Sequence, residues 1–583
     1  MPTQSKLLIL LLVVALGAVS WASPVHPVHA QHAMVASVHE LASRAGVEVM
    51  QAGGNAIDAA VATGFALAVV FPQAGNIGGG GFMLIRMADG TAHFVDFREK
   101  APAAATANMY LDANGNVIPH ASVIGYKAIA VPGSVAGLVY AQKKYGKLTL
   151  DRDMAPAIKL ARDGYTLTWE DARDFANKDL TTFPESRRIF QRDGNYYKEG
   201  ELFRQPELAK TLEKISANPQ SFYRGAMAKE IAAFIQQGGG LVTSDDLAAY
   251  EVKEREPVRG TYRGYDILSA PPPSSGGVAL IEILNILEGY DLNRLGSRSA
   301  DSVQLTVEAF RRAFFDRAEF MGDPDFSRIP VPQLIDKRYA EAWRESIVPK
   351  RATPSPELQR PAIFSQLEQY AAAHPGMAIG PESDNTTQYS IVDAGGNAVS
   401  VTTTLNEYFG SHVTVAGLGF VLNDEMDDFS SKPGVPNYYG LIQGPANAIG
   451  PAKRPLSAMT PTIVTRDGNL FLVLGSPGGP RIITTVANIL MGVVDYGMDI
   501  QTAVNAPRFH HQWEPDLVRV EQWFSLDTVR ALEREGYRVE FGVGSGDEWE
   551  PTWSDGECVE VDPKTGERLG ASDDRDNGKA VGY

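Results

Sequence analysis

The sequence has one cysteine, Cys558, among 583 residues. A single thiol cannot form an intramolecular disulfide, so the fold must be stabilised by core packing. No histidine motif frames this thiol, which favours a small buried residue over a catalytic nucleophile. The adjacent pair His510 and His511 lacks the carboxylate or cysteine spacing that completes a metal site. We interpret these histidines as structural and expect no metal.

The chain also lacks an excess of basic over acidic residues. Lys and Arg number 53 against 70 Asp and Glu, which gives a formal net charge of -17. Binding to phosphate backbones needs the opposite balance, so nucleic acid is not an expected partner. Hydrophobic residues make up 44% of the chain and no long linker interrupts it, which favours one large core over several domains.

Long hydrophobic runs are absent except at the start of the chain. Residues 7–19 form a 13-residue apolar run behind Lys6, and Ser20-Trp21-Ala22 follows with small residues at the -3 and -1 positions. A membrane span needs about 20 residues, so residues 1–22 are predicted to be a cleavable signal peptide. We expect an exported protein, periplasmic or secreted, without a stable membrane anchor.

The rest of the chain alternates helical and strand patterns. The first half predicts helices layered on a sheet, residues 130–380 are mostly helical in pattern, and strands dominate after residue 386. A hairpin is expected around the turn 394–397, and a second around Asp467-Gly468. Helices are expected at 42–51, 56–70, 208–215, 226–237, 302–317 and from Pro480, and strands at 81–87, 91–97, 461–464 and 470–474.

The run from Asn385 to Ser390 predicts a threonine nucleophile made by cutting the chain. Residues 375–384, rich in Pro, Gly and acids, end abruptly at Thr386, where the hairpin pattern begins. A threonine at a new N-terminus carries its own base, because its α-amine titrates at about 7.7 to 8.0. Before cleavage the same hydroxyl could attack the carbonyl of Asn385 in an N-to-O acyl shift.

A glycine-rich turn supplies the complementary group. Residues 475–481 stand between an apolar strand and the apolar run 482–490, with Pro480 suited to a first helical turn. Free backbone N–H groups at a helix N-terminus can bind an oxyanion. A tight strand-to-helix turn without function is the alternative, and a phosphate loop is disfavoured because no Gly-Lys-Ser/Thr follows.

Taken in order, several strings resemble those of the γ-glutamyltranspeptidases (glutathione hydrolases), which are N-terminal nucleophile hydrolases made as self-cleaving precursors. The resemblance covers nearly the whole chain and implies an α+β fold, a four-layer αββα sandwich. The strings are His26-Pro27-Val28-His29-Ala30, Asn76-Ile77-Gly78-Gly79-Gly80-Gly81-Phe82, Asp96-Phe97-Arg98-Glu99, Pro271-Pro272-Pro273-Ser274-Ser275-Gly276-Gly277, Asn385-Thr386-Thr387, Asp427-Asp428-Phe429, Arg454-Pro455-Leu456-Ser457 and Ala506-Pro507-Arg508-Phe509-His510-His511.

The resemblance also implies roles for individual residues. A γ-glutamyl donor carries an α-carboxylate and an α-ammonium on one carbon, so its site needs a guanidinium and carboxylates. One departure is visible, because many bacterial relatives have two serines where this chain has Ser457 and Ala458. The implied roles are Thr404 hydrogen-bonded to the nucleophile, Gly478 and Gly479 as the oxyanion hole, Arg98 and Ser457 on the carboxylate, Asn406, Glu425 and Asp428 around the ammonium, and Tyr439 at the tip of a lid.

The expected protein is a precursor that cuts itself between Asn385 and Thr386. The large chain, residues 23–385, and the small chain, 386–583, stay associated as a heterodimer. The substrates are glutathione and other γ-glutamyl compounds, the acceptors are water, amino acids or dipeptides, and no cofactor is required. One alternative is an acylase for glutaryl or β-lactam side chains, against which Asp428 argues. The other is an uncut, non-catalytic secreted binding protein.

Overall fold

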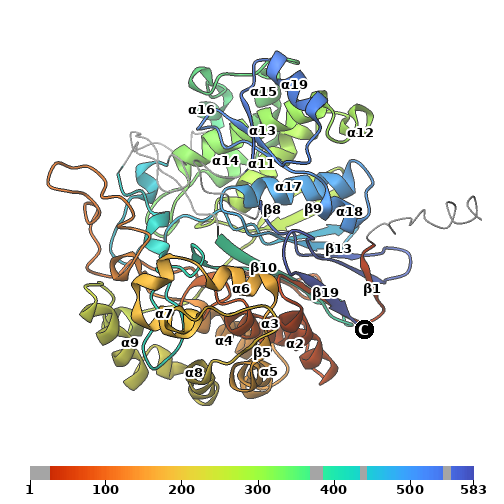
Figure 1. Ribbon diagram of the computed structural model, residues 1–583. Coiled ribbons are helices and arrows are strands. Elements are labelled where there is room, and N and C mark those ends of the chain that lie inside the picture. Colours follow the sequence, from red (N-terminus) through yellow and green to blue (C-terminus); the bar gives the residue numbers. More distant parts are fainter. Residues whose placement is uncertain (1–25, 368–384, 433–442, 543–552) are drawn as a thin grey trace, which may run out of the picture.

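Two seven-stranded sheets face each other between two layers of helices in the computed structural model (Figure 1). The structure describes residues 26–367, 385–432, 443–542 and 553–583. The predicted signal peptide, residues 1–22, lies outside this part of the chain. The order of layers, helices above and below a pair of sheets, is the αββα sandwich, so the expected α+β fold class is confirmed.

Both sheets are antiparallel throughout. The first contains, in spatial order, β19 (Lys579–Gly582), β2 (Met34–Ser37), β10 (Asn385–Val392), β11 (Ala398–Asn406), β3 (Gly80–Arg86), β4 (Ala92–Asp96) and β7 (Lys253–Arg255). The second contains β1 (Val28–Ala30), β18 (Arg568–Ala571), β17 (Cys558–Val561), β13 (Asn469–Leu474), β12 (Thr462–Arg466), β9 (Tyr265–Ser269) and β8 (Val258–Tyr262).

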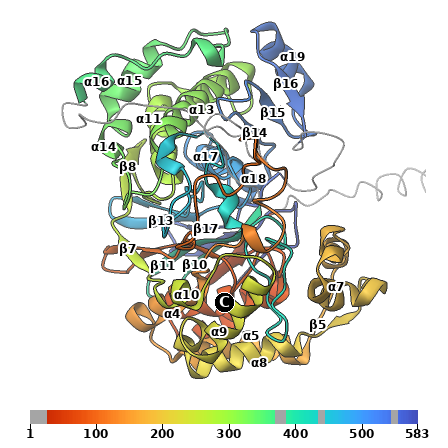
Figure 2. The ribbon, with the colours of Figure 1, turned by 90° about the vertical axis from the view of Figure 1, so that its left-hand side faces the viewer.

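Helices cover the outer face of each sheet, and the view turned by 90° shows the same stacking (Figure 2). The first sheet is covered by α2 (Glu40–Gln51), α3 (Ala56–Val70) and α4 (Ser134–Tyr145), with α5 (Leu150–Asp163), α8 (Pro206–Ala217) and α9 (Ala226–Gln237) beyond them. The second is covered by α11 (Gly276–Leu287), α17 (Arg481–Val494) and α18 (Ile500–Asn505), with α13 (Ala300–Phe320) and α15 (Lys337–Glu345) outside.

Shorter elements connect these layers. Two small sheets lie apart from the main pair, one of β5 and β6 and one of β14, β15 and β16. Their bounds, with those of the remaining helices, are β5 (Tyr165–Thr166), β6 (Leu202–Phe203), β14 (Phe509–His510), β15 (Val518–Val520), β16 (Val539–Phe541), α6 (Trp169–Phe175), α7 (Pro184–Gln191), α10 (Ser244–Ala248), α12 (Leu292–Leu295), α14 (Val331–Leu334), α16 (Ile363–Leu367) and α19 (Leu526–Arg534).

Helix α3 illustrates why the core is tightly packed. Asn55 and Asp58 form a reciprocal capping box at its N-terminus, and all of its residues are buried. The helix lies against β10 so closely that a Cβ at Gly64 would sit 2.7 Å from the hydroxyl of Tyr389. An apolar helix without a polar face belongs in the interior. Among the described residues, no helix is long and apolar enough to cross a membrane.

The expected elements match observed ones, but several strands of the two main sheets were not predicted: β1, β2, β7, β17, β18, β19 and the hairpin of β8 and β9. Each helix and strand predicted above has its counterpart, and Cys558 is buried as predicted. The hairpin of β8 and β9, at 258–269, was not predicted, because residues 130–380 were read as mostly helical. Both arms are short, and β8 alternates buried and exposed residues for only five positions at the edge of its sheet. Such an arm carries little periodic signal.

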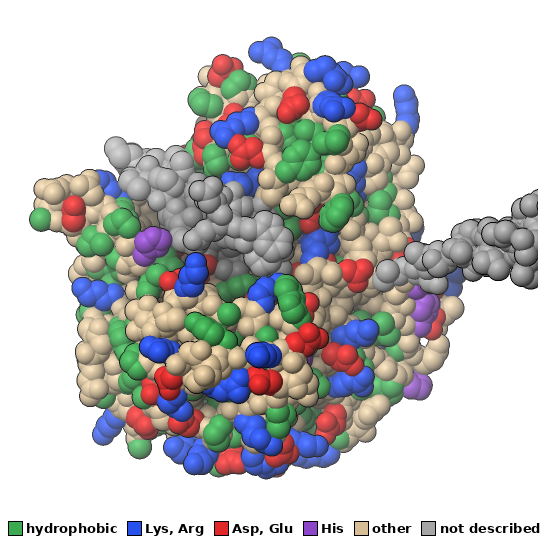
Figure 3. Space-filling model, viewed as in Figure 1, with side chains coloured by type: hydrophobic (Ala, Val, Ile, Leu, Met, Phe, Trp, Pro, Cys, Tyr) green, Lys and Arg blue, Asp and Glu red, His purple; other side chains and the backbone are tan. Residues whose placement is uncertain are grey.

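Charged groups of both signs are interspersed on the face of the molecule seen in Figure 3. Lys and Arg side chains lie beside Asp and Glu over the lower helical layer.

Candidate active site

The residue predicted as nucleophile lies at the start of β10, where the first sheet meets the second. Thr386 pairs in register with Thr404 on β11, and its Oγ1 is 3.4 Å from the Oγ1 of Thr404. The same oxygen of Thr404 accepts a hydrogen bond from the backbone N–H of Asn406 at 2.8 Å. The ladder shifts register between Asn385 and Thr386. Thr386 keeps 6% of its surface exposed, so its hydroxyl is held in place yet accessible.

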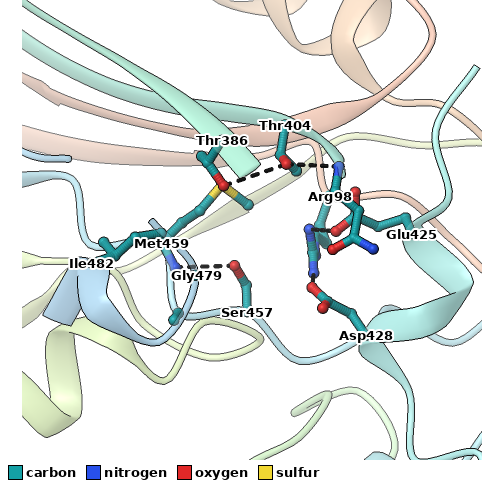
Figure 4. A pocket seen from close by; sticks show the side chains of 11 residues that line it. Arg98, Thr386, Thr404, Glu425, Asp428, Ser457, Met459, Gly479 and Ile482 are labelled. Carbon is teal, nitrogen blue, oxygen red and sulfur yellow. Dashed lines mark hydrogen bonds and ion pairs between the residues drawn. The ribbon is translucent and has the colours of Figure 1, made fainter. Parts of the chain in front are cut away.

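A small pocket opens in front of this hydroxyl (Figure 4). Of the site residues predicted from the sequence, the pocket brings eight together from segments far apart in the chain. Gly478 stands one position before the lining residue Gly479, and Tyr439 lies outside the described residues. The lining is Arg98, Thr386, Thr404, Asn406, Glu425, Asp428, Ser457, Ala458, Met459, Gly479 and Ile482.

Arg98 is the cationic centre of the pocket. Its guanidinium is hydrogen-bonded to Glu425 through Nη1 and to Asp428 through Nη2, and each contact is buried. Two backbone carbonyls, of Pro455 at 3.3 Å and Leu456 at 3.0 Å, accept from its other N–H groups. A fork of charge-assisted bonds fixes the plane of the guanidinium. Figure 4 shows this arginine and the two acids on the side of the pocket away from Ile482.

More carboxyl groups surround Arg98 than one guanidinium can neutralise. Burial raises the pKa of Glu425 and Asp428, even though the charge of Arg98 opposes the shift. It raises the pKa of Glu99, whose carboxylate is 3.6 Å from Arg98, to about 7. The pKa of Asp427, which accepts from Ser122, is likewise raised to about 7 by burial. The pocket is thus an acidic environment that favours a second cation.

Two oxygen atoms of the pocket residues have no hydrogen-bond partner among the described residues: Oδ1 of Asn406 and Oε2 of Glu425. Asn406 ends β11 in a left-handed conformation with φ of 85°, and its amide nitrogen donates to Asp424 at 3.0 Å. That bond directs the other amide atom away from Asp424. Buried acceptors without a donor are costly, so these oxygens mark a place where a ligand donor would be stabilised.

The glycine turn lies opposite, between β13 and α17. Gly478 and Gly479 have φ of 120° and 55°, conformations that favour glycine. Their carbonyls accept from the N–H groups of Arg481 and Ile482 at 3.0 Å each, so the turn runs directly into the helix. Ser554 supports it from behind through a 2.6 Å bond to Ser476. Figure 4 shows Gly479 beside Ser457 and facing Thr386 across the pocket.

Three residues were not predicted to line the pocket: Met459, Ile482 and Ala458, the last of which the sequence analysis noted only as a departure from the motif. Met459 and Ile482 form an apolar side next to Thr386, as Figure 4 shows. Each directly follows a predicted segment in the sequence, but an apolar residue beside a motif is indistinguishable from core without coordinates. Asp424 and Asp427 place further carboxyl groups near the pocket and were not predicted as site residues. The only indication of them in the sequence is the high proportion of acids from 424 to 428.

A family model described as gamma-glutamyltranspeptidase matches residues 42–583. The chain belongs to the γ-glutamyltranspeptidase family. It is 47% identical over 545 residues to the glutathione hydrolase proenzyme of Escherichia coli K12, an alignment that covers 93% of this chain and 90% of that protein. The resemblance that the sequence motifs suggested is therefore confirmed.

Solved structures agree with this membership. The γ-glutamyltranspeptidase of Helicobacter pylori is 46% identical, with a TM-score of 0.55 over 58% of this chain and 96% of that one. A cephalosporin acylase from Bacillus halodurans matches with a TM-score of 0.81 over 97% of this chain and 98% of that one, at 28% identity. Both activities named by these structures occur on this fold, and the higher identity is with the γ-glutamyltranspeptidase.

Proposed function

We propose that this member of the γ-glutamyltranspeptidase family is a self-cleaving γ-glutamyltransferase and glutathione hydrolase with Thr386 as its nucleophile. The observation that carries the proposal is the pocket that joins a threonine hydroxyl, a buried arginine and two buried acids. A nucleophile alone would fit many acyl transfers. The paired charges beside it fit an acyl group that ends in an α-amino acid.

Recognition of this end rests on an exchange of ion pairs. Arg98 would turn from its acids to the α-carboxylate of the donor, with Ser457 adding a hydrogen bond. The α-ammonium would replace the guanidinium at Asp428 and Glu425 and donate to Oδ1 of Asn406, which has no other donor among the described residues. The number of charge-assisted bonds is then conserved, so a buried charge is never left alone.

The chemistry is acyl transfer in two steps. After cleavage, the α-amine of Thr386 would take the proton of its own Oγ1 while this oxygen attacks the γ-carbonyl carbon. The N–H groups of Gly478 and Gly479 would bind the resulting oxyanion, and each such donor is worth about 2.7 to 4 kcal/mol in acyl-transfer enzymes. The amine returns the proton to the leaving nitrogen, and water or the amine of an amino acid or dipeptide then attacks the acyl-threonine ester.

Maturation uses the same hydroxyl. Oγ1 of Thr386 would attack the carbonyl of Asn385, and hydrolysis of the ester would release residues 23–385 and 386–583 as a large and a small chain. We propose that the two stay together as a heterodimer, that residues 1–22 direct export to the periplasm or the medium, and that Tyr439 closes over the acyl-enzyme.

The first test compares wild type with Thr386→Ala by denaturing gel and intact mass. We expect two fragments from the wild type, the smaller one beginning at Thr386, and one uncut chain from the variant. A wild-type chain that stays uncut would refute self-cleavage and favour the binding-protein alternative.

A second assay separates the proposed activity from that of an acylase. The cut enzyme should hydrolyse γ-glutamyl-p-nitroanilide. It should hydrolyse glutaryl-p-nitroanilide, which lacks the α-ammonium, at a rate at least tenfold lower. Asp428→Ala should abolish the first activity. Faster turnover of the glutaryl substrate, or an unaffected Asp428→Ala variant, would favour the acylase function that the Bacillus halodurans structure carries.

A further inference from the structure

A buried polar column extends behind Thr386 into the space between the two sheets. Alternate residues of a strand share a face, so Thr386, Gln388 and Ser390 all point toward the second sheet. Their partners in register on β11 are polar as well. Elsewhere this space is apolar, filled by side chains such as Phe82, Leu84 and Leu472. We call the three cross-strand pairs the polar column: Thr386 with Thr404, Gln388 with Thr402, and Ser390 with Ser400.

Gln388 is the centre of the column and is fully buried. Its Oε1 accepts from the hydroxyl of Thr402 at 2.7 Å. Its Nε2 donates to Oγ of Ser400 at 3.0 Å, to Oγ of Ser390 at 3.3 Å and to the carbonyl of Tyr389 at 3.1 Å. Both ends of the amide are satisfied, which fixes its orientation.

The column is tied to the second sheet at the strand that leads to the glycine turn. Ser400 donates to the carbonyl of Leu474, the last residue of β13, at 3.0 Å. Ser390 donates to the carbonyl of Glu557 at 2.6 Å, and the N–H of Glu557 donates to the carbonyl of Gly475 at 3.3 Å. These bonds connect the nucleophile strand to the first residue of the turn.

Direct contact makes the same connection. A Cβ built on Gly475 would lie 2.3 Å from Cδ and Oε1 of Gln388 and 2.6 Å from its Nε2. These are the three nearest atoms, so Gly475 lacks a side chain where the amide of Gln388 lies. Gly478 and Gly479 follow three and four residues later in the turn.

We propose that Gln388 is a positioning residue whose buried amide sets the spacing between the strand of Thr386 and the glycine turn, and so aligns the nucleophile with the oxyanion-binding N–H groups. This inference rests on the function proposed above. A misplacement of about 1 Å in such a site can cost about 100-fold in rate. Because Gln388 does not line the pocket, its loss should act on kcat and leave substrate affinity intact.

The first test replaces the amide by a side chain of similar length, Gln388→Met, and measures γ-glutamyl-p-nitroanilide hydrolysis per cut molecule. We expect kcat to fall at least tenfold, with KM within about twofold. The matched control is Thr387→Val on the same strand. Thr387 is also buried and its hydroxyl has no hydrogen-bond partner among the described residues, so kcat should stay within about twofold. Equal kcat for Gln388→Met and wild type would overturn the inference, even if the melting temperature of the variant falls.

The second test uses the contact with Gly475. Gly475→Ala should lower kcat at least tenfold in the wild-type background, because the new methyl group displaces the amide. In a Gln388→Ala background the methyl group has room, and the further loss should stay below about threefold. The same loss in both backgrounds would mean that the contact does not set the turn, and would contradict the inference.

Failure of the proposed function can be distinguished from failure of this inference. If the wild type does not hydrolyse γ-glutamyl-p-nitroanilide, the proposed substrate is wrong. The inference is then tested by the rate at which the chain between Asn385 and Thr386 is cut, which Gln388→Met should slow at least tenfold. A cutting rate equal to that of the wild type would overturn this inference alone. A wild type that is never cut would overturn both, because Thr386 would then have no reaction for which it must be aligned.

Discussion

Ala458 is the pocket residue at which this chain departs from the family motif. It lacks the hydroxyl oxygen of the serine that many bacterial relatives have at this position. Its side chain lines the pocket next to Ser457 and is almost fully buried. A methyl group offers no hydrogen bond to the α-carboxylate of a γ-glutamyl donor. A hydrogen bond to a charged group contributes about 1.5 to 3 kcal/mol.

Ala458→Ser should therefore lower KM for γ-glutamyl-p-nitroanilide by about tenfold with little change in kcat. Ser457→Ala is the mirror variant and should raise KM by a similar factor. Steady-state kinetics on fully cut enzyme measure both. A KM that does not move in Ala458→Ser would mean that the added hydroxyl does not reach the carboxylate.

Thr404 provides a second test at this scale, because its hydroxyl has bonds on both sides. It is 3.4 Å from the hydroxyl of Thr386 and accepts from the N–H of Asn406 at 2.8 Å. Thr404→Val keeps the shape and removes these bonds, so kcat should fall roughly tenfold, as expected for the loss of about one hydrogen bond and its alignment. Thr404→Ser keeps the hydroxyl and should stay within about threefold of wild type. Equal kcat values for Thr404→Val and Thr404→Ser would show that the hydroxyl of Thr404 does not contribute to catalysis.

Single residues were predictable from the sequence when a string of several carried the information. Arg98, Thr386 and Asp428 stand in such strings, and the pocket brings them together. Met459 and Ile482 could not be found this way, because an apolar residue acquires a role only from the side chains across the pocket. Gln388 belongs to the run from Asn385 to Ser390 that predicted the nucleophile. Its partner Gly475 lies 87 positions further along the chain, and only folding brings the two into contact.

At the scale of elements, helix α5 contains a carboxyl group that the fold buries, although a carboxylate is more stable in water. Asp153 is fully buried beside Asp58 of α3, and neither of its oxygens has a hydrogen-bond partner among the described residues. Burial, with the nearby charge of Asp58, raises the pKa of Asp153 to about 8. In the unfolded chain this pKa is about 3.9. The folded state therefore binds the proton more tightly, and stability falls as the pH rises from about 4 through 8.

Asp153→Asn should remove this dependence. The variant should match wild type near pH 4 and be more stable by about 1 to 3 kcal/mol at pH 8 and above, where the wild type must bury a charge or reorganise. Melting temperatures at pH 4, 6 and 8.5 give the comparison. Asp151→Asn, on the exposed side of the same helix, should change little at any pH. A constant difference between Asp153→Asn and wild type across this range would contradict the raised pKa.

Elements with a strong period were predictable, and most of the short strands were not, whether they lie at an edge or inside a sheet. The first hairpin, β10 and β11, was found from its alternation and its turn at 394–397, and α3 from its apolar length. The pairing of β9 with β12 joins residues about 200 positions apart. Nothing local in the sequence specifies that partner, since it depends on the two sheets closing over the same core.

At the scale of the whole molecule, the position of Thr386 in the strand order decides what a cut would do. Both sheets mix strands from before and after this residue. Five ladders between described strands join the two sides of the cut: β1 with β18, β9 with β12, β2 with β19, β2 with β10, and β3 with β11. The last residue, Tyr583, also accepts from the N–H of His32 at 2.7 Å.

Separation of the two chains would break these ladders and expose the core between the sheets, to which both sides contribute. We therefore predict that the cut enzyme elutes as one species whose mass, by light scattering, is that of both chains together or a multiple of it. Backbone ladders and apolar side chains make much of this contact, and the ion pairs of Arg98 with Glu425 and Asp428 that cross it are buried, where salt screens them little. We therefore expect that 1 M NaCl does not separate the two chains, whereas denaturant does. Uncut Thr386→Ala provides the reference for elution volume. A small chain that elutes by itself in native buffer would show that the interleaved sheets do not hold the two parts, and the proposed heterodimer would be wrong.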